Sequence, residues 1–333
     1  MTETQNIEQA ENDNPNSFVV EADDEGTRLD AYLADRIEGW SRAKLQRLIE
    51  NEDVLVNEKK VKPSHKLRKN DEVEVDLIEA TAARFEPENI PLDIVFEDEF
   101  LAVINKPAGM VVHPGAGVQS GTLANAIAYH FALGVPSLGG QPAEAGTPSE
   151  NRIGIVHRLD KDTSGLIVVA KNDEIHEALS EQFRERTVYK SYMALVHGQT
   201  DENTGKIDVP IGRNKHNRLR MKVATYGRTA LTLWRVRSRY DKFTLLDVEI
   251  KTGRTHQIRV HMGYINHPVV GDEIYNEGRD NTVADITVRN AVVTMRRFFL
   301  HAEKLSFTHP KTGERMEFKQ ELPPELKQFL ELL

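Results

Sequence analysis

The sequence predicts an α+β fold, in which a large mixed, mostly antiparallel sheet with flanking helices and loops follows a small α/β module. Two observations lead to this prediction. Strand-like segments outnumber helical ones over residues 91–330 and do not alternate with them, which favours antiparallel pairing over βαβ winding. Residues 18–78 carry their own short pattern of strand, two helices and two strands, which is typical of a separate domain.

Composition limits the classes of protein that the chain can belong to. Its 333 residues suffice for two domains, and the absence of cysteine excludes disulfides and thiolate metal sites. No apolar run reaches about 18 residues and the first 25 residues lack a signal-peptide core, so we expect a cytoplasmic protein that does not enter a membrane. The net charge is -9, but residues 1–25 hold eight acidic residues and no Lys or Arg, which leaves the remainder nearly neutral. Residues 1–17 are polar and acidic, and we expect a disordered tail there.

Residues 18–78 combine a small core with many bases. A strand at 18–20 precedes a helix whose apolar face carries Leu29 and Leu33, and Ser41 is placed to cap a second helix over 42–50. Strands follow near 54–57 and 73–77. Ten of the bases in this module predict either a solvated basic face or a surface for RNA: Arg28, Arg42, Lys44, Arg47, Lys59, Lys60, Lys62, Lys66, Arg68 and Lys69.

A linker is expected at 79–90, and the second domain is expected to span 91–330. Strands are predicted at 94–96, 101–106, 187–196, 229–236, 243–250, 300–307 and 315–318, with helices at 122–129, after Asn172, and at 324–333. Two stretches, 133–151 and 276–293, are interpreted as soft insertions. A basic excursion at 200–227 contains Arg213 and Arg218, which either contact a polyanion or lie on a solvated strand edge.

The stretch from Ile153 to Lys171 is the strongest candidate for a site. A polar loop from His157 to Gly165 lies between two apolar runs, and the second run, Leu166 to Ala170, is typical of a strand buried on both faces. Core strands on both sides hold a loop rigidly, which is how reactive groups are commonly presented. The alternative is an ordinary charged turn.

Several chemistries can be weighed from the residues alone. The histidines show no zinc spacing, and Ser164 lies outside a Gly-x-Ser-x-Gly pattern, so metal and serine-hydrolase chemistry are disfavoured. Asp160 and Asp162 leave paired-carboxylate glycoside chemistry open. A single carboxylate, Asp160, held ionised by an arginine such as Arg254, is the other possibility, with Tyr192 available to stack on a base.

Two family resemblances sharpen this picture. Residues 28–30, 41–49, 54–57 and 71–75 resemble the signature positions of the S4 RNA-binding domain. His157-Arg-Leu-Asp-Lys-Asp-Thr-Ser-Gly-Leu, Tyr189-Lys-Ser-Tyr-Met-Ala-Leu-Val and Gly253-Arg-Thr-His-Gln-Ile-Arg-Val-His resemble, in order, the three motifs of the RluA-type pseudouridine synthases. The similarity spans roughly residues 18–330.

The resemblance implies the pseudouridine synthase fold, an RNA uridine isomerase and a role for each matched residue. Asp160 would attack a flipped uridine, Tyr192 would stack on the base, and Arg254 would pair with the aspartate. Arg158 would fill the gap left by the extruded base. It further implies that no cofactor or metal is needed, that the partner is large-subunit ribosomal RNA, in an intersubunit stem-loop, and that the chain is a monomer. RNA contacts are expected from Arg158, His157, Arg42, Lys44, Arg47, Arg213 and Arg218.

Three alternatives stay open at this point. The chain could be a non-catalytic RNA-binding or ribosome-assembly factor that keeps the fold, a family member acting on other ribosomal or transfer RNA uridines, or a nucleoside glycosidase, which would release free uracil.

Overall fold

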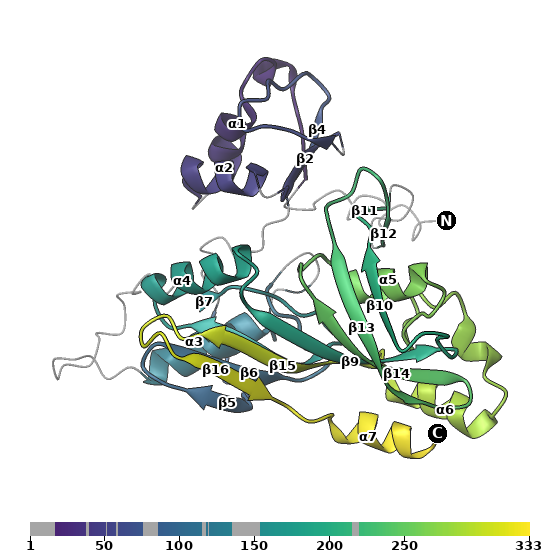
Figure 1. Ribbon diagram of the computed structural model, residues 1–333. Helices are drawn as coiled ribbons and strands as arrows, with labels where there is room; N and C mark the ends of the chain where they lie inside the picture. The colour runs from purple at the N-terminus through teal and green to yellow at the C-terminus, as the bar shows by residue number, and fades with distance from the viewer. Residues whose placement is uncertain are drawn as a thin grey trace, which may run out of the picture.

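A computed structural model describes residues 17–37, 40–50, 52–57, 59–75, 86–114, 118, 120–134, 154–214 and 220–333 (Figure 1). The expected tail at 1–17 lies outside the described residues except for Ser17, as do most of the linker, most of the first insertion, Arg218, and the side chain of Lys44. Among the described helices, none has the length and apolar character needed to cross a bilayer.

The N-terminal domain packs two helices on one small sheet. Helices α1 (Leu29–Arg36) and α2 (Arg42–Glu50) bury their apolar faces against strands in the order β1-β4-β2-β3. The strands are β1 (Ser17–Val19), β2 (Val54–Val56), β3 (Lys59–Lys60) and β4 (Glu72–Val75), and a short 3-10 turn, η1, covers Ala22–Asp24. Asp30 is fully buried where the helices meet, and Arg28, Arg42 and Gln46 donate hydrogen bonds to it. These bonds satisfy the buried carboxylate and join α1 to α2.

The second domain is built on one long sheet, in which ten strands are described. Its main path runs β10-β13-β14-β9-β15-β8-β6-β5, with β16 beside β15 and β7 beside β8. All of these neighbours are antiparallel except β15 and β8, so the prediction of a mostly antiparallel mixed sheet is confirmed. The strands are β5 (Ile94–Glu97), β6 (Leu101–Lys106), β7 (Gly154–Ile155), β8 (Ser164–Ala170), β9 (Tyr189–His197), β10 (Thr204–Asp208), β13 (Leu231–Arg239), β14 (Phe243–Ile250), β15 (Leu300–Thr308) and β16 (Arg315–Lys319).

Alternating side chains of the central strands supply cores on both faces of the sheet. Ile167 and Val169 of β8 join one core with Tyr192 and Ala194 of β9, covered by α3 (Leu123–Gly134) and α5 (Gln257–Tyr264). Leu166 and Val168 point to the opposite face. Helices α4 (Asp173–Arg184), α6 (Ile286–Met295) and α7 (Pro324–Glu331) cover that face. Strand β8 is therefore buried on both faces, as its unbroken apolar run predicts.

Two helices depart from the expected elements. The second soft insertion, 276–293, contains a 3-10 turn, η2 (Arg279–Thr282), and most of α6, whose N-cap Asp285 accepts hydrogen bonds from the backbone of Thr287 and Val288. Helix α5 follows β14 at residues where no helix was expected. A separate two-stranded hairpin, β11 (Ile211–Arg213) with β12 (Met221–Val223), forms part of the basic excursion.

Candidate active site

The loop that carries Asp160 is fixed by a buried lysine. The side chain of Lys106, at the end of β6, is fully buried, and its Nζ donates to the carbonyl oxygens of Pro107 (2.8 Å), Met110 (2.8 Å) and Lys161 (3.0 Å). The backbone of Thr163 donates to the Asp160 carbonyl at 3.1 Å, which closes a turn. Because these bonds tie two loops to a core strand, Asp160 projects from a rigid support.

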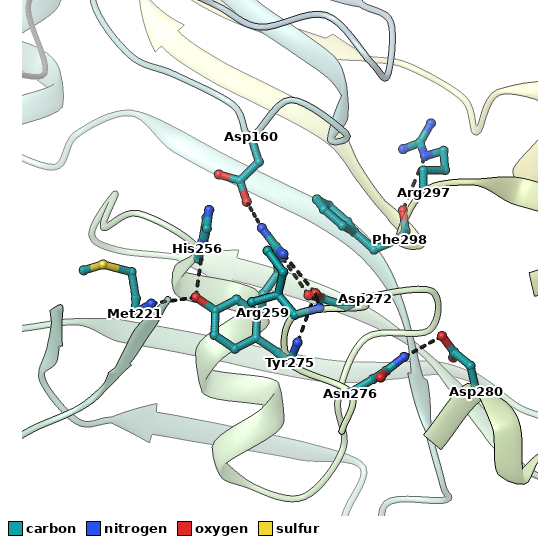
Figure 2. A network of polar contacts seen from close by, with 11 residues as sticks. Asp160, Met221, His256, Arg259, Asp272, Tyr275, Asn276, Asp280, Arg297 and Phe298 are labelled. Atoms are coloured by element: carbon teal, nitrogen blue, oxygen red, sulfur yellow. Dashed lines mark hydrogen bonds and ion pairs between the residues drawn. The ribbon is translucent and has the colours of Figure 1, made fainter. Parts of the chain in front are cut away.

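Arg259 on α5 holds the Asp160 carboxylate. Its Nη1 lies 3.1 Å from Asp160 Oδ2, while Nε and Nη2 bind both oxygens of the fully buried Asp272 at 2.6 and 2.9 Å (Figure 2). The guanidinium also lies 4.3 Å from the ring centre of Phe298 and 5.0 Å from that of Tyr275. A bidentate pair and two aromatic faces leave this guanidinium one orientation, with its remaining nitrogen directed at Asp160.

The surroundings keep Asp160 ionised although it is largely enclosed. Burial acts to raise its pKa, but the charge of His256 where that ring is protonated, the charge of Arg259 and the hydrogen bond from Arg259 outweigh burial, so the pKa lies below its ordinary value. Its side chain is still 21% exposed, so the carboxylate can be reached from the cleft. The group is thus an accessible anion at neutral pH, suited to act as a nucleophile.

The predicted pairing of Arg254 with Asp160 is wrong. Arg254 Nη1 instead binds Asp53 of the N-terminal domain at 2.7 Å. The cause is local: Gln257 accepts from Thr252 and from the backbone of Arg254, which pins the turn before α5 and directs the Arg254 side chain away from Asp160. Arg259 lies on the helix itself. The third motif contains both arginines, and the position of helix α5, which was not predicted, determines which of them reaches the Asp160 carboxylate.

Tyr192 lines two adjoining hollows. It is 6% exposed and lines both a hollow of about 60 Å³ that contains Asp160 and Arg259 and an adjoining cleft of about 330 Å³. Burial and then the nearby charge of Asp160 raise the pKa of its hydroxyl, so the phenol stays neutral. The structure thus brings Asp160 and Tyr192 to one site, as predicted. Arg254 also lines the smaller hollow, but Arg259 is the arginine that binds Asp160.

A second hydrogen-bond network, which the sequence did not predict, borders the site. His256 has a left-handed backbone (φ 55°) at the start of α5, and its Nδ1 lies 2.8 Å from the hydroxyl of Tyr275. That hydroxyl also accepts from the backbone of Met221, so β12 is tied to the site (Figure 2). Burial lowers the pKa of His256, although Asp160 opposes the shift. The position of the histidine in the third motif was the only sequence signal for it.

The predicted RNA-contacting residues differ in what they can do. Arg158 is exposed and lines both hollows. His157 also lines the cleft, but it is 8% exposed, stacks on Phe183 and accepts a hydrogen bond from the backbone of Val168, which gives it a structural role. In the N-terminal domain, Arg42 binds Asp30 and Arg47 lies 3.4 Å from Glu177 of α4, with both side chains about half exposed. Arg213 is half-buried in β11.

Ser164 has a structural role in this site. It is 3% exposed, its hydroxyl lies 2.8 Å from His301 Nδ1, and Arg297 donates to it at 2.9 Å. This buried network links the first residue of β8 to β15 and leaves the serine unavailable as a nucleophile.

A fold of this kind, with one ionised aspartate beside a buried tyrosine and an accessory basic domain, defines a class of RNA-modifying enzymes. Family comparison agrees: residues 100–264 match the RNA pseudouridylate synthase family and residues 27–73 match the S4 domain. The chain is 40% identical to an RNA pseudouridine synthase of Bacillus subtilis, YlyB, over 92% of this chain and 94% of that protein. It is 38% identical to ribosomal large subunit pseudouridine synthase D of Xanthomonas campestris over 92% and 89%.

A solved structure extends the match to three dimensions. Human RNA pseudouridylate synthase domain containing 1 superposes with a TM-score of 0.54 at 27% identity, covering 73% of this chain and 89% of that one. The chain therefore belongs to the RluA-type family of RNA pseudouridine synthases and carries an N-terminal S4 domain. It is an isomerase, and its substrate is RNA.

Proposed function

We propose that this enzyme converts specific uridines of large-subunit, 23S-type ribosomal RNA to pseudouridine, in a stem-loop that faces the small subunit. The support comes from relatives that bear the name ribosomal large subunit pseudouridine synthase D, such as those of Xanthomonas campestris and of Neisseria meningitidis serogroup A, the latter 41% identical over 97% of this chain. Such a substrate implies action in the cytoplasm. Because one chain supplies every residue of the site described above, a monomer suffices.

We infer that Asp160 is the nucleophile. The single observation that carries this inference is an ionised, reachable carboxylate held by Arg259 at the edge of a hollow lined by Tyr192. The carboxylate attacks the uridine, either at the sugar carbon or at the base. The bond between C1′ and N1 breaks, the uracil turns, and C1′ bonds to C5. The bond that Asp160 formed to the uridine breaks again, which returns the carboxylate to its ionised form. N1 gains a proton and C5 loses one, so the mass is unchanged.

The uridine has to leave its stack to reach this carboxylate, because the hollow holding Asp160 offers only about 60 Å³. Tyr192 provides an aromatic face for the extruded base, and its raised pKa keeps the ring neutral there. Arg158, exposed beside the opening, is placed to enter the space that the base leaves in the RNA.

Substituting Asp160→Asn tests this assignment. The amide keeps the shape of the side chain but cannot act as the nucleophile, so pseudouridine formation on a 23S-type transcript should disappear. The dissociation constant for the RNA should stay within about twofold, because only one of many contacts with the RNA is altered. Asp162→Asn, two residues further along the same loop, is the matched control and should retain activity. Loss of folding or of RNA binding in Asp160→Asn would assign Asp160 a structural role instead.

Mapping pseudouridine in the RNA of cells with and without the gene tests the substrate. Loss of modified positions from large-subunit ribosomal RNA is expected. If the lost positions lay in transfer RNA or in the small-subunit RNA, the proposed substrate would be wrong while the isomerase would stand.

A further inference from the structure

The S4 domain in this structure is attached at the mouth of the active-site cleft. Asp53 binds Arg254 at 2.7 Å, and its carbonyl oxygen accepts from Arg228 at 2.8 Å. Beside it, the hydroxyl of Thr229 donates to Glu52 at 2.9 Å. The side chains of Asp53 and Arg254 are only 7% and 10% exposed, so this is a largely desolvated contact between domains.

The cleft at this contact is walled by opposite charges. The S4 domain contributes Glu50, Glu52 and Asp53 to the cleft of about 330 Å³. The catalytic domain contributes Tyr192 and a wall of cations: Arg158, Arg184, Arg186, Lys190, Lys251 and Arg254. An acidic end of one domain therefore covers a basic surface directly beside the residues that act on uridine.

The contact between the two domains is of a kind that can open. None of the apolar clusters found in the described residues contains side chains from both: the S4 core draws on residues 18–75 and every other cluster on residue 92 and beyond. The contacts of Asp53 and Glu52 that cross the boundary are polar. An interface of this kind within a chain resembles a transient one, for which relative movement is the ordinary behaviour.

We propose that Arg254 is a binding position for a backbone phosphate of the substrate RNA and that Asp53 fills it in the free protein, so that RNA binding displaces the S4 domain from the cleft. The inference rests on the proposed function, since it takes the flanking phosphates of the target uridine as the ligand. A guanidinium fork fits a carboxylate and a phosphate with the same paired geometry, so one anion can replace the other.

The free energy of a buried ion pair favours an exchange of Asp53 for a phosphate over a permanently closed cleft. Desolvation offsets much of the attraction in a buried ion pair, so the closed state need be only moderately preferred. If the cleft is closed about 90% of the time, the affinity for RNA is reduced about tenfold relative to a cleft that is always open. The contact would then reject weak, non-specific RNA, which supplies too few phosphates to displace Asp53.

The first test compares two charge-neutralising substitutions. Asp53→Asn removes the competitor of the phosphate and should tighten binding of a 23S-type transcript by about threefold to tenfold. Glu50→Gln is the matched control, because it removes the same charge from the same cleft but at an exposed position at the end of α2. In an Arg254→Ala background the gain from Asp53→Asn should vanish. The proposal would be overturned if Asp53→Asn and Glu50→Gln increased the affinity for RNA equally, or if Asp53→Asn increased it as much in the Arg254→Ala background. Either result would mean that the acidic residues only repel RNA in general.

A second measurement follows the domains directly. Because the natural chain has no cysteine, spin labels can be placed on Lys69→Cys and Lys242→Cys, both at exposed positions in different domains. Free protein should give one dominant distance, which Asp53→Asn or added transcript shifts and Glu50→Gln does not. An unchanged distance on RNA binding would overturn the proposal.

Assaying the same samples for pseudouridine distinguishes a failure of the proposed substrate from a failure of the proposed domain displacement. Distances that move while no pseudouridine forms in the transcript would contradict the proposed substrate alone. Pseudouridine that forms while the distances stay fixed would contradict the displacement alone.

Discussion

Arg254 and Arg259 lie five residues apart in one motif and serve different anions. Arg259 divides its guanidinium between the buried Asp272 and Asp160, the proposed nucleophile, whereas Arg254 reaches across a domain boundary to Asp53. The difference arises because the side chain of Arg254 leaves the turn before α5 toward Asp53, while Arg259 is buried in the helix and packed against Phe298. Substitutions at these two positions should therefore give distinguishable kinetics.

Arg259→Gln should lower kcat by about a hundredfold to a thousandfold, because a charged partner of the nucleophile is lost inside an enclosed site. In the proposed mechanism the ionised form of Asp160 is the active one, and Arg259 helps to hold the pKa of this carboxyl low. Without that charge the pKa rises, so activity should be lost at a higher pH as the solution is acidified. The measurement is the pH dependence of single-turnover rates.

Arg254→Gln is the control for that experiment. It should change RNA affinity while leaving the acid limb of the profile where it is, since Arg254 bonds to Asp53 and Thr229. If the acid limb shifted in Arg254→Gln and stayed in place in Arg259→Gln, the roles assigned to the two arginines would be reversed.

At the scale of single residues, the sequence reveals the proposed reactive side chains better than their partners. Asp160 and Tyr192 could be predicted because both lie in motifs that resemble those of the family, and because each is carried by a strongly apolar strand or the loop next to one. The partner of Asp160 could not, because it depends on the direction of a turn set by Gln257 and on Asp272, which no periodic pattern marks.

Strands β8 and β15 form the parallel junction at the middle of the sheet, and Gly165 makes their close approach possible. It has a φ of +112°, and a Cβ there would lie 2.3 Å from the carbonyl oxygen of Ala302. The loop with Asp160 leads directly into this position. Any side chain would therefore strain the backbone and separate the two strands beside the site.

Gly165→Ala should lower the free energy of unfolding by about 3 kcal/mol or more, since backbone strain and a backbone clash add. Gly313→Ala is the matched control: its φ is +74°, but an added methyl group would meet nothing within 4 Å, so only the cost of the left-handed conformation, about 1 kcal/mol, applies. Urea unfolding of both variants measures the difference. Equal losses would mean that the junction can relax around the methyl group.

Elements with a clear period or cap were predictable, and those without were not. Helix α4 carries Ile175 and Leu179 on one face and is capped by Asn172, and its start was predicted from these signals. Helix α5 is buried along most of its length, mixes polar with apolar residues and begins at a left-handed His256 that provides no side-chain cap. It therefore shows neither an amphipathic stripe nor a start signal, and tertiary packing determines it.

The molecule as a whole consists of two domains, and in the described residues no apolar cluster contains side chains from both. Deleting residues 1–78 should leave a catalytic domain that folds, because its clusters contain no side chain from that region. The cations of the S4 domain would be lost, so RNA binding should weaken and its dependence on salt should become shallower. The single-turnover rate at saturating RNA should largely persist.

Binding isotherms of the truncated and full-length proteins at several salt concentrations provide the measurement. An unchanged salt slope would remove the S4 domain from RNA docking. Loss of the rate at saturation would show that the domain contributes to the chemistry as well as to binding.

The order of strands along the chain has a consequence for how the enzyme is made. Strand β15, which pairs with both β8 and β9 at the centre of the sheet, is contributed by residues 300–308 of 333. During translation the two halves of the sheet exist before the piece that joins them has been synthesised. A nascent chain can therefore complete this sheet only after β15 has been synthesised, and we expect termination of translation before β15 to yield an inactive product.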